Sequence, residues 1–296
     1  MSLSPALCGD RFEITGAAGR LNLYASGAGP AMLLIHSVNA VASAAEMRPL
    51  YMHYAARRRV YCLELPGFGM SERSDRHYTP RLMTDAVIAA AGEIKARTGE
   101  GVLDALALSL SCEFLARAAV EYPGHFSRLA FVSPTGLSGR RELSGRPGTT
   151  LGNPWLYRAL RGPGSPGWGG TLYGWLTRRN VIRYFLRRTW GSSLIDEPLW
   201  RYGIETARQP GAQFAPLYFL SGELFSADLH SIYARFTHPV FMSHGVRGDF
   251  TNYRLEGMIA DRPKCRLSVY QTGALPYFEE LERFCADYDE FMAEGP

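Results

Sequence analysis

The chain has 296 residues, enough for one large α/β domain with a substantial insertion. Hydrophobic residues make up 46% of it and aromatic residues 12%, which excludes wholesale disorder. The formal net charge is only +4, and all but two of the 32 basic residues are arginine. Because these arginines form no coherent basic stripe, we expect no nucleic-acid partner.

The cysteines and the lack of a secretory or membrane-spanning pattern indicate the compartment in which the protein is expected. The five cysteines are widely spaced, and no pair has the spacing of metal ligands, so we expect free thiols in a reducing, cytoplasmic compartment. Residues 1–10 lack a secretory pattern, and no run of about 18 apolar residues predicts a membrane span. Glycine patterns that bind dinucleotides or nucleoside triphosphates are missing, so we expect no cofactor and no metal.

In the first half of the chain, short apolar runs alternate with helical patterns. We expect strands at residues 11–18, 20–26, 31–36, 60–65, 102–110 and 129–133, and helices at 43–56, 80–97 and 111–122. The run at 31–36 is apolar almost throughout, as in a strand buried on both faces. This alternation predicts right-handed βαβ units and a mostly parallel sheet.

The alternation stops between residues 137 and 233, a stretch rich in Gly, Pro, Trp, Tyr and Arg. It resumes with strands at 239–245 and 266–270 and a helix at 277–292. We therefore expect a core domain made of residues 1–136 and 234–296, interrupted by a helical cap at 137–233. Four tryptophans of this stretch suggest a cap that lines an apolar cavity, namely Trp155, Trp168, Trp175 and Trp200.

One strand-to-helix junction, at residues 105–114, carries the pattern of a nucleophilic serine, with Ser111 at the turn. A serine on such a strained turn needs small residues two positions to either side. Ser109 meets this requirement on one side, but Glu113 departs from it on the other. The alternatives are that Ser111 is a plain helix N-cap and that Glu113 is a carboxylate favoured by the helix dipole or a functional group near the site.

Five segments, in this order, resemble the α/β-hydrolase family, and the resemblance covers nearly all of the chain outside the cap. They are residues 36–39 for its oxyanion loop, 65–71 for the next turn, 109–113 for the nucleophile elbow, 245–249 for the acid loop and 273–279 for the histidine loop. The resemblance is to the capped, epoxide hydrolase- or esterase-like branch. It implies an eight-stranded, mostly parallel sheet flanked by helices, with a helical cap insertion.

The resemblance also implies roles for single residues. Ser111 stands at the nucleophile, Asp249 at the orienting acid, and the backbone N–H groups of Val38 and Cys112 at the oxyanion hole. The catalytic histidine of the family corresponds to Ala274 here. A triad needs an imidazole to move the proton, and removing it costs on the order of 10⁶ in rate in a working serine protease.

Other residues are candidates for a replacement base or for structural support. His244 either braces the acid loop or reaches the pocket, and His36 is expected to brace its own loop. Glu279, Tyr277 and Glu113 are the non-histidine candidates for a base, with Glu279 expected to point away from the pocket. Asp249 has a second interpretation, as a turn residue beside a glycine.

Two functions remain open from the sequence. The first is action on an acyl ester, a thioester or a related carbonyl compound through Ser111, with an incomplete triad. The second is a non-hydrolytic or catalytically silent protein that binds a small apolar or acyl-type ligand in the retained pocket. An engineered replacement of histidine would leave the same pattern. In either case we expect weak or no turnover of generic short-chain esters.

A basic and aromatic stretch runs from Arg178 to Trp190, with charges at roughly helical spacing. This pattern fits contact with a membrane surface or an acidic ligand. It fits equally well the solvated face of a cap helix that covers an apolar pocket wall. The sequence indicates no oligomeric state.

Overall fold

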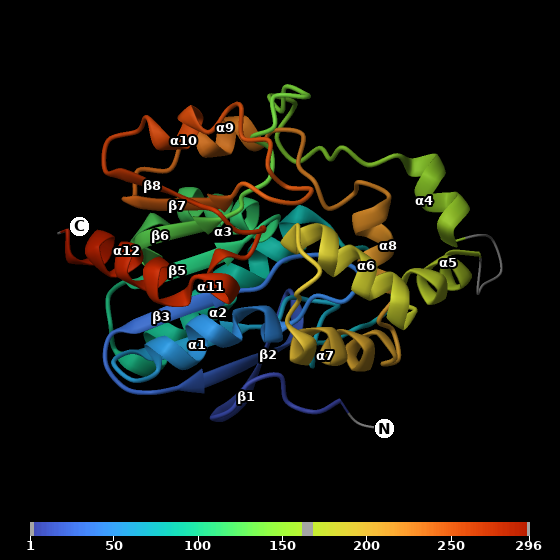
Figure 1. Cartoon of the computed structure of the whole chain (residues 1–296), viewed down its shortest axis with the longest axis horizontal. Helices are drawn as coiled ribbons and strands as arrows, with labels where there is room; N and C mark the ends of the chain where they lie inside the picture. Colours follow the sequence, from blue (N-terminus) through green and yellow to red (C-terminus); the bar gives the residue numbers. More distant parts are fainter. Residues whose placement is uncertain (1–2, 162–167, 295–296) are drawn as a thin grey trace.

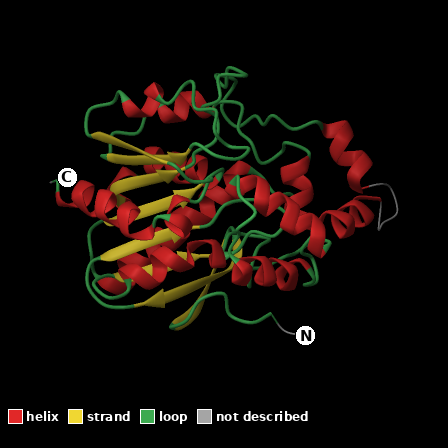
Figure 2. Ribbon diagram, viewed as in Figure 1, coloured by secondary structure: helices red, strands yellow, loops and turns green. Residues whose placement is uncertain are grey.

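The computed structural model describes residues 3–161 and 168–294, in which eight strands form one sheet between two layers of helices (Figures 1 and 2). The strand order is β1-β2-β4-β3-β5-β6-β7-β8. Strand β2 pairs antiparallel with β1 and β4, and every other neighbouring pair is parallel. The predicted fold class, a mostly parallel eight-stranded sheet flanked by helices, is confirmed.

The predicted strands are present, with ends that differ by a few residues. They are β1 (Asp10–Gly16), β2 (Gly19–Ser26), β3 (Ala31–Ile35), β4 (Arg59–Leu63), β5 (Leu103–Leu108), β6 (Phe126–Val132), β7 (Val240–Gly245) and β8 (Cys265–Tyr270). The difference that matters most is at β5, which ends at Leu108 and not at residue 110. The turn that follows this strand therefore begins two residues earlier than the sequence suggested.

The core helices follow the predicted pattern, with two of them divided. They are α1 (Arg48–Tyr54), preceded by the 3₁₀ turn η1 (Ala44–Met47), α2 (Pro80–Thr98), α3 (Ser111–Glu121), α11 (Pro276–Glu279) and α12 (Leu281–Ala293), with the short turn η2 (Pro123–His125) before β6. The predicted helix at 43–56 is divided into η1 and α1, and the one at 277–292 into α11 and α12. Pro49 lies in the first turn of α1, and Pro276 is the first residue of α11. Proline lacks an N–H and is favoured at such a start, so it fixes where these helices begin.

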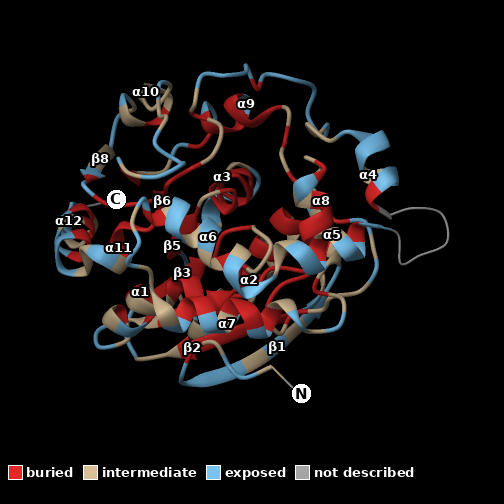
Figure 3. Ribbon diagram, turned by 45° about the vertical axis from the view of Figure 1, so that its right-hand side comes forward, coloured by how far each residue is buried: buried red, intermediate tan, exposed pale blue. Residues whose placement is uncertain are grey.

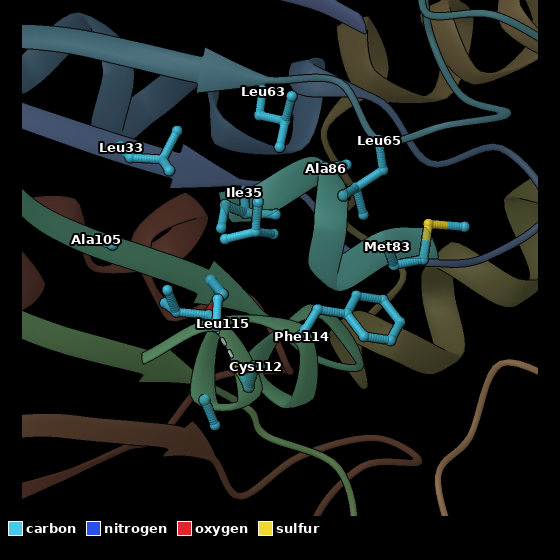
Figure 4. Packing of buried hydrophobic residues seen from close by; sticks show 14 of the residues in the cluster. Leu33, Ile35, Leu63, Leu65, Met83, Ala86, Ala105, Cys112, Phe114 and Leu115 are labelled. Atoms are coloured by element: carbon cyan, nitrogen blue, oxygen red, sulfur yellow. Dashed lines mark hydrogen bonds between the residues drawn. The ribbon is translucent and has the colours of Figure 1, made fainter. Parts of the chain in front are cut away.

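Each face of the sheet packs against its own helices, because side chains alternate along a strand. Leu33, Ile35 and Ala105 point to one face, where they meet α2 and α3 (Figure 4). The intervening residues Met32 and Leu34 point to the other face, which α1 and α12 cover. The two apolar layers hold the strand ends in fixed positions, and these ends carry the candidate site.

Between β6 and β7 the described residues form α4 (Pro154–Arg161), α5 (Trp168–Leu176), α6 (Arg179–Trp190), α7 (Glu197–Ala207), α8 (Phe214–Leu220) and α9 (Leu229–Tyr233). Figure 1 shows α4 to α8 beyond the carboxyl ends of the strands, whereas α9 lies beside α3 and α10 (Gly257–Ala260). The last part of the predicted cap thus packs on the core. The division at residues 137 and 233 stays a prediction.

The four tryptophans predicted to line a cavity are, with one exception, exposed or half-exposed. Trp155 is 76% exposed and Trp168 54% exposed, because they lie on the outer faces of α4 and α5, and Figure 3 shows much of α4 as exposed. Trp175 is half-exposed beside a surface groove, and only Trp200 of the four is buried. None of the described helices is both long and apolar enough to cross a membrane.

Candidate active site

The sharp turn between β5 and α3 is centred on Ser109. This residue has φ of 58°, in the left-handed region that residues other than glycine seldom adopt. Its N–H donates to the carbonyl oxygen of Val132 at the end of β6, at 2.8 Å, and the residue is partly exposed. Strain of this kind costs about 1–3 kcal/mol and is found mainly where function requires it.

Ser111, the residue assigned to the turn from the sequence, lies instead in the first turn of α3 and is fully buried. Its hydroxyl donates to the carbonyl oxygen of His36 at 2.5 Å. The structure therefore differs from the sequence interpretation by two residues. The small residues on either side of the strained position are Ala107 and Ser111, so Glu113 no longer departs from the pattern.

The backbone N–H of Cys112, predicted from the sequence to be an oxyanion donor, is already hydrogen-bonded within the protein. That group donates to the carbonyl oxygen of Ser109 at 3.1 Å, within the first turn of the helix. The thiol lies 3.2 Å from the carbonyl oxygen of Ala107, and burial raises its pKa well above the usual range. Cys112 is thus a packed core residue, and the N–H group next to the elbow belongs to Leu110.

The loop after β3 lies beside this turn, because β3 and β5 are parallel neighbours with Ile35 opposite Ala107. In this loop the Ser37 N–H donates to the Glu46 carboxylate at 2.8 Å, so it is not free to bind a ligand. Within the described residues, no protein acceptor is found for the N–H groups of Val38 and Leu110. The geometry leaves these two groups as candidate donors to a carbonyl oxygen.

His36 supports the same loop. Burial lowers its pKa to about 4, so the imidazole is neutral near pH 7. Its Nδ1 lies 2.6 Å from the carbonyl oxygen of Ser37, and its Nε2 accepts from the Leu65 N–H at 3.1 Å. A neutral ring with Nδ1 protonated satisfies both contacts, as expected for a bracing residue.

Ala274, which is predicted to stand at the position of the family's histidine, lies against the C-terminal end of α6. Its N–H donates to the carbonyl oxygen of Thr189 at 3.0 Å, and its own carbonyl oxygen accepts from the Ser133 hydroxyl at 2.7 Å. Ala274 shares an apolar cluster with Trp190, whose indole packs against the Phe278 ring at 5.5 Å. Ala274 is only 6% exposed, so protein atoms cover this part of the loop.

Asp249, predicted to orient the base, is bound to the same helix end. Its carboxylate pairs with the Arg188 guanidinium at 2.6 and 2.8 Å, and its N–H donates to the Arg188 carbonyl oxygen at 3.1 Å. This pairing raises the pKa of Arg188. The structure thus brings Asp249 together with α6 and with Ala274, and its role as an orienting acid stays a prediction.

The remaining candidates for a base have structural partners. His244 stacks on Tyr253 with ring centroids 4.0 Å apart, and its Nε2 lies 3.0 Å from the Glu256 carboxylate. The Glu279 carboxylate accepts from the Gly273 N–H at 2.8 Å and pairs with Arg247. Among the described residues, no imidazole is hydrogen-bonded to Ser109.

Tyr277 is likewise a structural residue. It is fully buried, and its hydroxyl donates to the carbonyl oxygen of Glu46 at 3.0 Å. Burial raises its pKa well above that of a free tyrosine, so the phenolate needed for a base is not formed at neutral pH. Its contact with Glu46 ties the histidine loop to η1.

Cavities of about 710, 400, 1010 and 180 Å³ open elsewhere in the described part of the molecule, and Ser109 lines none of these four. The largest follows the outer side of α5 and the start of α6. Two arginines of the basic helix α6 form ion pairs, Arg183 with Glu197 and Arg188 with Asp249. Contact of α6 with a membrane surface stays a prediction.

The strain at Ser109 predicts an unusual response to substitution. Ser109→Gly is expected to raise the free energy of unfolding by up to about 1 kcal/mol, because glycine adopts positive φ without steric cost. Ser111→Gly is the matched control, and it is expected to lower stability, since it removes the bond to His36 and puts glycine into a helix. Urea unfolding of both variants checks this, and a loss of stability in Ser109→Gly would contradict it.

Comparison with known proteins supports the fold. No protein-family model and no curated protein sequence matches the chain. Among solved structures it is similar to a 2-hydroxy-6-oxo-6-phenylhexa-2,4-dienoate hydrolase from Rhodococcus sp. strain RHA1, with TM-score 0.74, 17% identity and coverage of 96% of this chain and 99% of that one. It is similar to a serine hydrolase involved in carbazole degradation, with TM-score 0.73, 14% identity and coverage of 96% and 99%.

A third similar structure is a carboxylesterase from Bacillus subtilis, with TM-score 0.68, 16% identity and coverage of 97% of this chain and 92% of that one. The sheet order, the strained elbow and these neighbours together define the class: the chain has the α/β-hydrolase fold. At these identities the likeness concerns the fold, and a reaction has to be argued from the site.

Proposed function

We propose that this protein binds a small acyl or carbonyl compound at the Ser109 elbow and does not hydrolyse it by a serine–histidine–acid triad. One observation carries the proposal: the C-terminal end of α6 is hydrogen-bonded to Ala274 at the histidine position. We assign Ala274 to the histidine position, so that an alanine under this helix end stands where an imidazole would accept the serine proton. The elbow itself keeps its strained backbone.

The ligand class follows from the donors that remain. The N–H groups of Leu110 and Val38 belong to neighbouring strand ends, which the Ser111 hydroxyl links through its bond to His36. Two unengaged backbone N–H groups at neighbouring strand ends suit one carbonyl oxygen, and they need no titrating side chain to do so. Our assignment of Ser109 and Leu110 replaces that of Ser111 and Cys112, while Val38 is retained.

Binding can be tested with 4-phenyl-2-butanone, a ketone that has no leaving group. In ¹⁵N-labelled protein, the amide resonances of Leu110 and Val38 are expected to shift on titration. Leu110→Pro removes the first donor at a position whose φ of −61° suits proline, and it is expected to weaken binding about tenfold; Leu110→Ala is the matched control. Should Leu110→Pro fail to fold, the amide shifts alone decide, and shifts that avoid both residues would contradict the proposal.

Hydrolysis is tested separately with p-nitrophenyl butyrate. The native protein and Ser109→Ala are expected to release p-nitrophenol at the same low rate, because no base activates the serine. Steady turnover that is lost in Ser109→Ala but kept in Ser111→Ala would overturn the claim that triad-type hydrolysis is missing.

A second candidate function is a single acylation of Ser109 without turnover. The left-handed backbone at Ser109 favours it, because such strain persists where a reactive side chain must be presented. In that case a butyryl ester would form on Ser109 and p-nitrophenol would leave once per molecule. A burst of one equivalent, followed by no further release, is the expected signature.

A further inference from the structure

A small cavity beside α3 contains a buried acid that the elbow does not use. The cavity has a volume of about 180 Å³ and is lined by Glu113, Arg140, Arg141, Leu143, Leu151 and Phe225, among others. Neither Ser109 nor Ala274 lines it. The inference drawn from it therefore goes beyond the proposed function and does not depend on the chemistry of the elbow.

Glu113 lines this cavity, and because it is fully buried we place it at the inner end. Its side chain is fully buried, and its Oε1 accepts from the Ser226 N–H at 3.0 Å. Its Oε2 is also buried and has no hydrogen-bond partner among the described residues. A buried acceptor without a donor costs about 1–3 kcal/mol, so a ligand that supplies a hydroxyl or N–H group there would recover part of this energy.

The opposite end of the cavity is basic. Arg140 and Arg141 line the cavity and are exposed, so we place their guanidinium groups at its outer end. Guanidinium groups bind carboxylates through paired hydrogen bonds and repel cations. A simple anion would meet the acid Glu113 at the inner end, so the two ends together select a molecule with a donor at one end and an anionic group at the other.

The middle of the cavity is apolar and about the size of one ring. Leu143, Leu151 and Phe225 line it, and a dry apolar cavity of roughly 150 Å³ is known to hold benzene. Phe225 adds an aromatic face on which a ring can pack.

We propose that this cavity binds a small hydroxyaryl carboxylate. The hydroxyl group of the ligand donates to Glu113 Oε2, its ring lies among the apolar side chains, and its carboxylate pairs with Arg140 and Arg141. Burial raises the pKa of Glu113 to about 7, and either protonation state leaves an oxygen lone pair that accepts this hydrogen bond.

Calorimetric titration with 4-hydroxybenzoate tests the proposal in the full-length protein at pH 7.5. We expect a dissociation constant of about 0.1 mM, a reasonable affinity for ten non-hydrogen atoms. Benzoate, which lacks the donor, and 4-methylphenol, which lacks the anion, are each expected to bind about tenfold more weakly. No heat with 5 mM 4-hydroxybenzoate, or equal affinity for benzoate, would overturn the assignment.

Variants separate the two ends of the cavity. The double variant Arg140→Ala/Arg141→Ala is expected to weaken 4-hydroxybenzoate about tenfold and leave 4-methylphenol unchanged; Arg146→Ala, an exposed arginine outside the cavity, is the matched control. Glu113→Gln is expected to lose the preference for 4-hydroxybenzoate over benzoate. If Glu113→Gln does not fold, the two exposed arginines still decide the outcome, and binding unaffected by their removal would refute the proposal.

One more variant distinguishes binding in this cavity from binding at the elbow. Ser109→Ala is expected to bind 4-hydroxybenzoate as the native protein does, because Ser109 does not line the cavity. Loss of binding in Ser109→Ala would place the ligand at the elbow and contradict the assignment to this cavity.

Discussion

Replacing Gly273 with alanine is expected to lower the free energy of unfolding by about 3 kcal/mol and to loosen the end of α6. A Cβ at Gly273 would collide with backbone atoms of Thr189 and Trp190. Backbone atoms cannot move aside by a change of rotamer, so either the histidine loop or the helix end must shift. The Ala274 N–H bond to Thr189 would then be strained or lost.

Urea unfolding measures the stability change, and amide hydrogen exchange of α6 (Arg179–Trp190) measures the loosening. Gly174→Ala in α5 is the matched control, because a Cβ there meets nothing within 4 Å. In a helix this change is expected to raise stability by roughly 0.5–1 kcal/mol. Unchanged stability and exchange in Gly273→Ala would show that the helix end is not held against this loop.

Asp228→Ala is expected to cost about 3–5 kcal/mol, because it leaves the buried Arg117 guanidinium without its partner. The two side chains pair at 2.7 Å, and Asp228 is only 1% exposed. Arg117 lies on α3, the helix that follows the elbow, and Asp228 immediately precedes α9. The pair thus fastens the end of the insertion to the helix that carries the candidate site.

Urea unfolding of three variants separates this effect from surface electrostatics. Glu121 lies on α3 like Arg117, and Glu121→Ala breaks its more exposed pair with Arg81 of α2, so this variant is expected to cost less than about 1 kcal/mol. The double variant Arg117→Met/Asp228→Leu is expected to recover most of the loss, since no unpaired charge remains buried. A cost in Asp228→Ala as small as that in Glu121→Ala would contradict a buried, unscreened pair.

The sheet could be predicted because its central strands are buried on both faces and so read as short apolar runs. The elbow could be located only to within two residues. The apolar run continues through Leu110, and a sequence does not show which residue takes up positive φ. The deciding signal was present in the small residues Ala107 and Ser111, which flank Ser109 at the required spacing.

The contacts that close the site could not be predicted, because they join residues far apart in the chain. Thr189 meets Ala274 through a backbone hydrogen bond, which leaves no trace in residue type. Arg188 meets Asp249 through a backbone hydrogen bond and a side-chain ion pair, but a sequence does not show which arginine pairs with which acid. The same holds for the unpartnered oxygen of Glu113, whose surroundings come from residues near 140 and 225. The assignment of Ala274 to the histidine position, in contrast, rests on the sequence pattern alone and stays a prediction.

The central claim is that Ser109 is the elbow residue and lacks an activating base, and a fluorophosphonate serine probe read by intact mass tests it most directly. The native protein is expected to label very slowly, at Ser109 only, with the adduct absent in Ser109→Ala and unchanged in Ser111→Ala. Rapid stoichiometric labelling of Ser109 would contradict the absence of a base. Labelling that is lost in Ser111→Ala and kept in Ser109→Ala would contradict the position of the elbow.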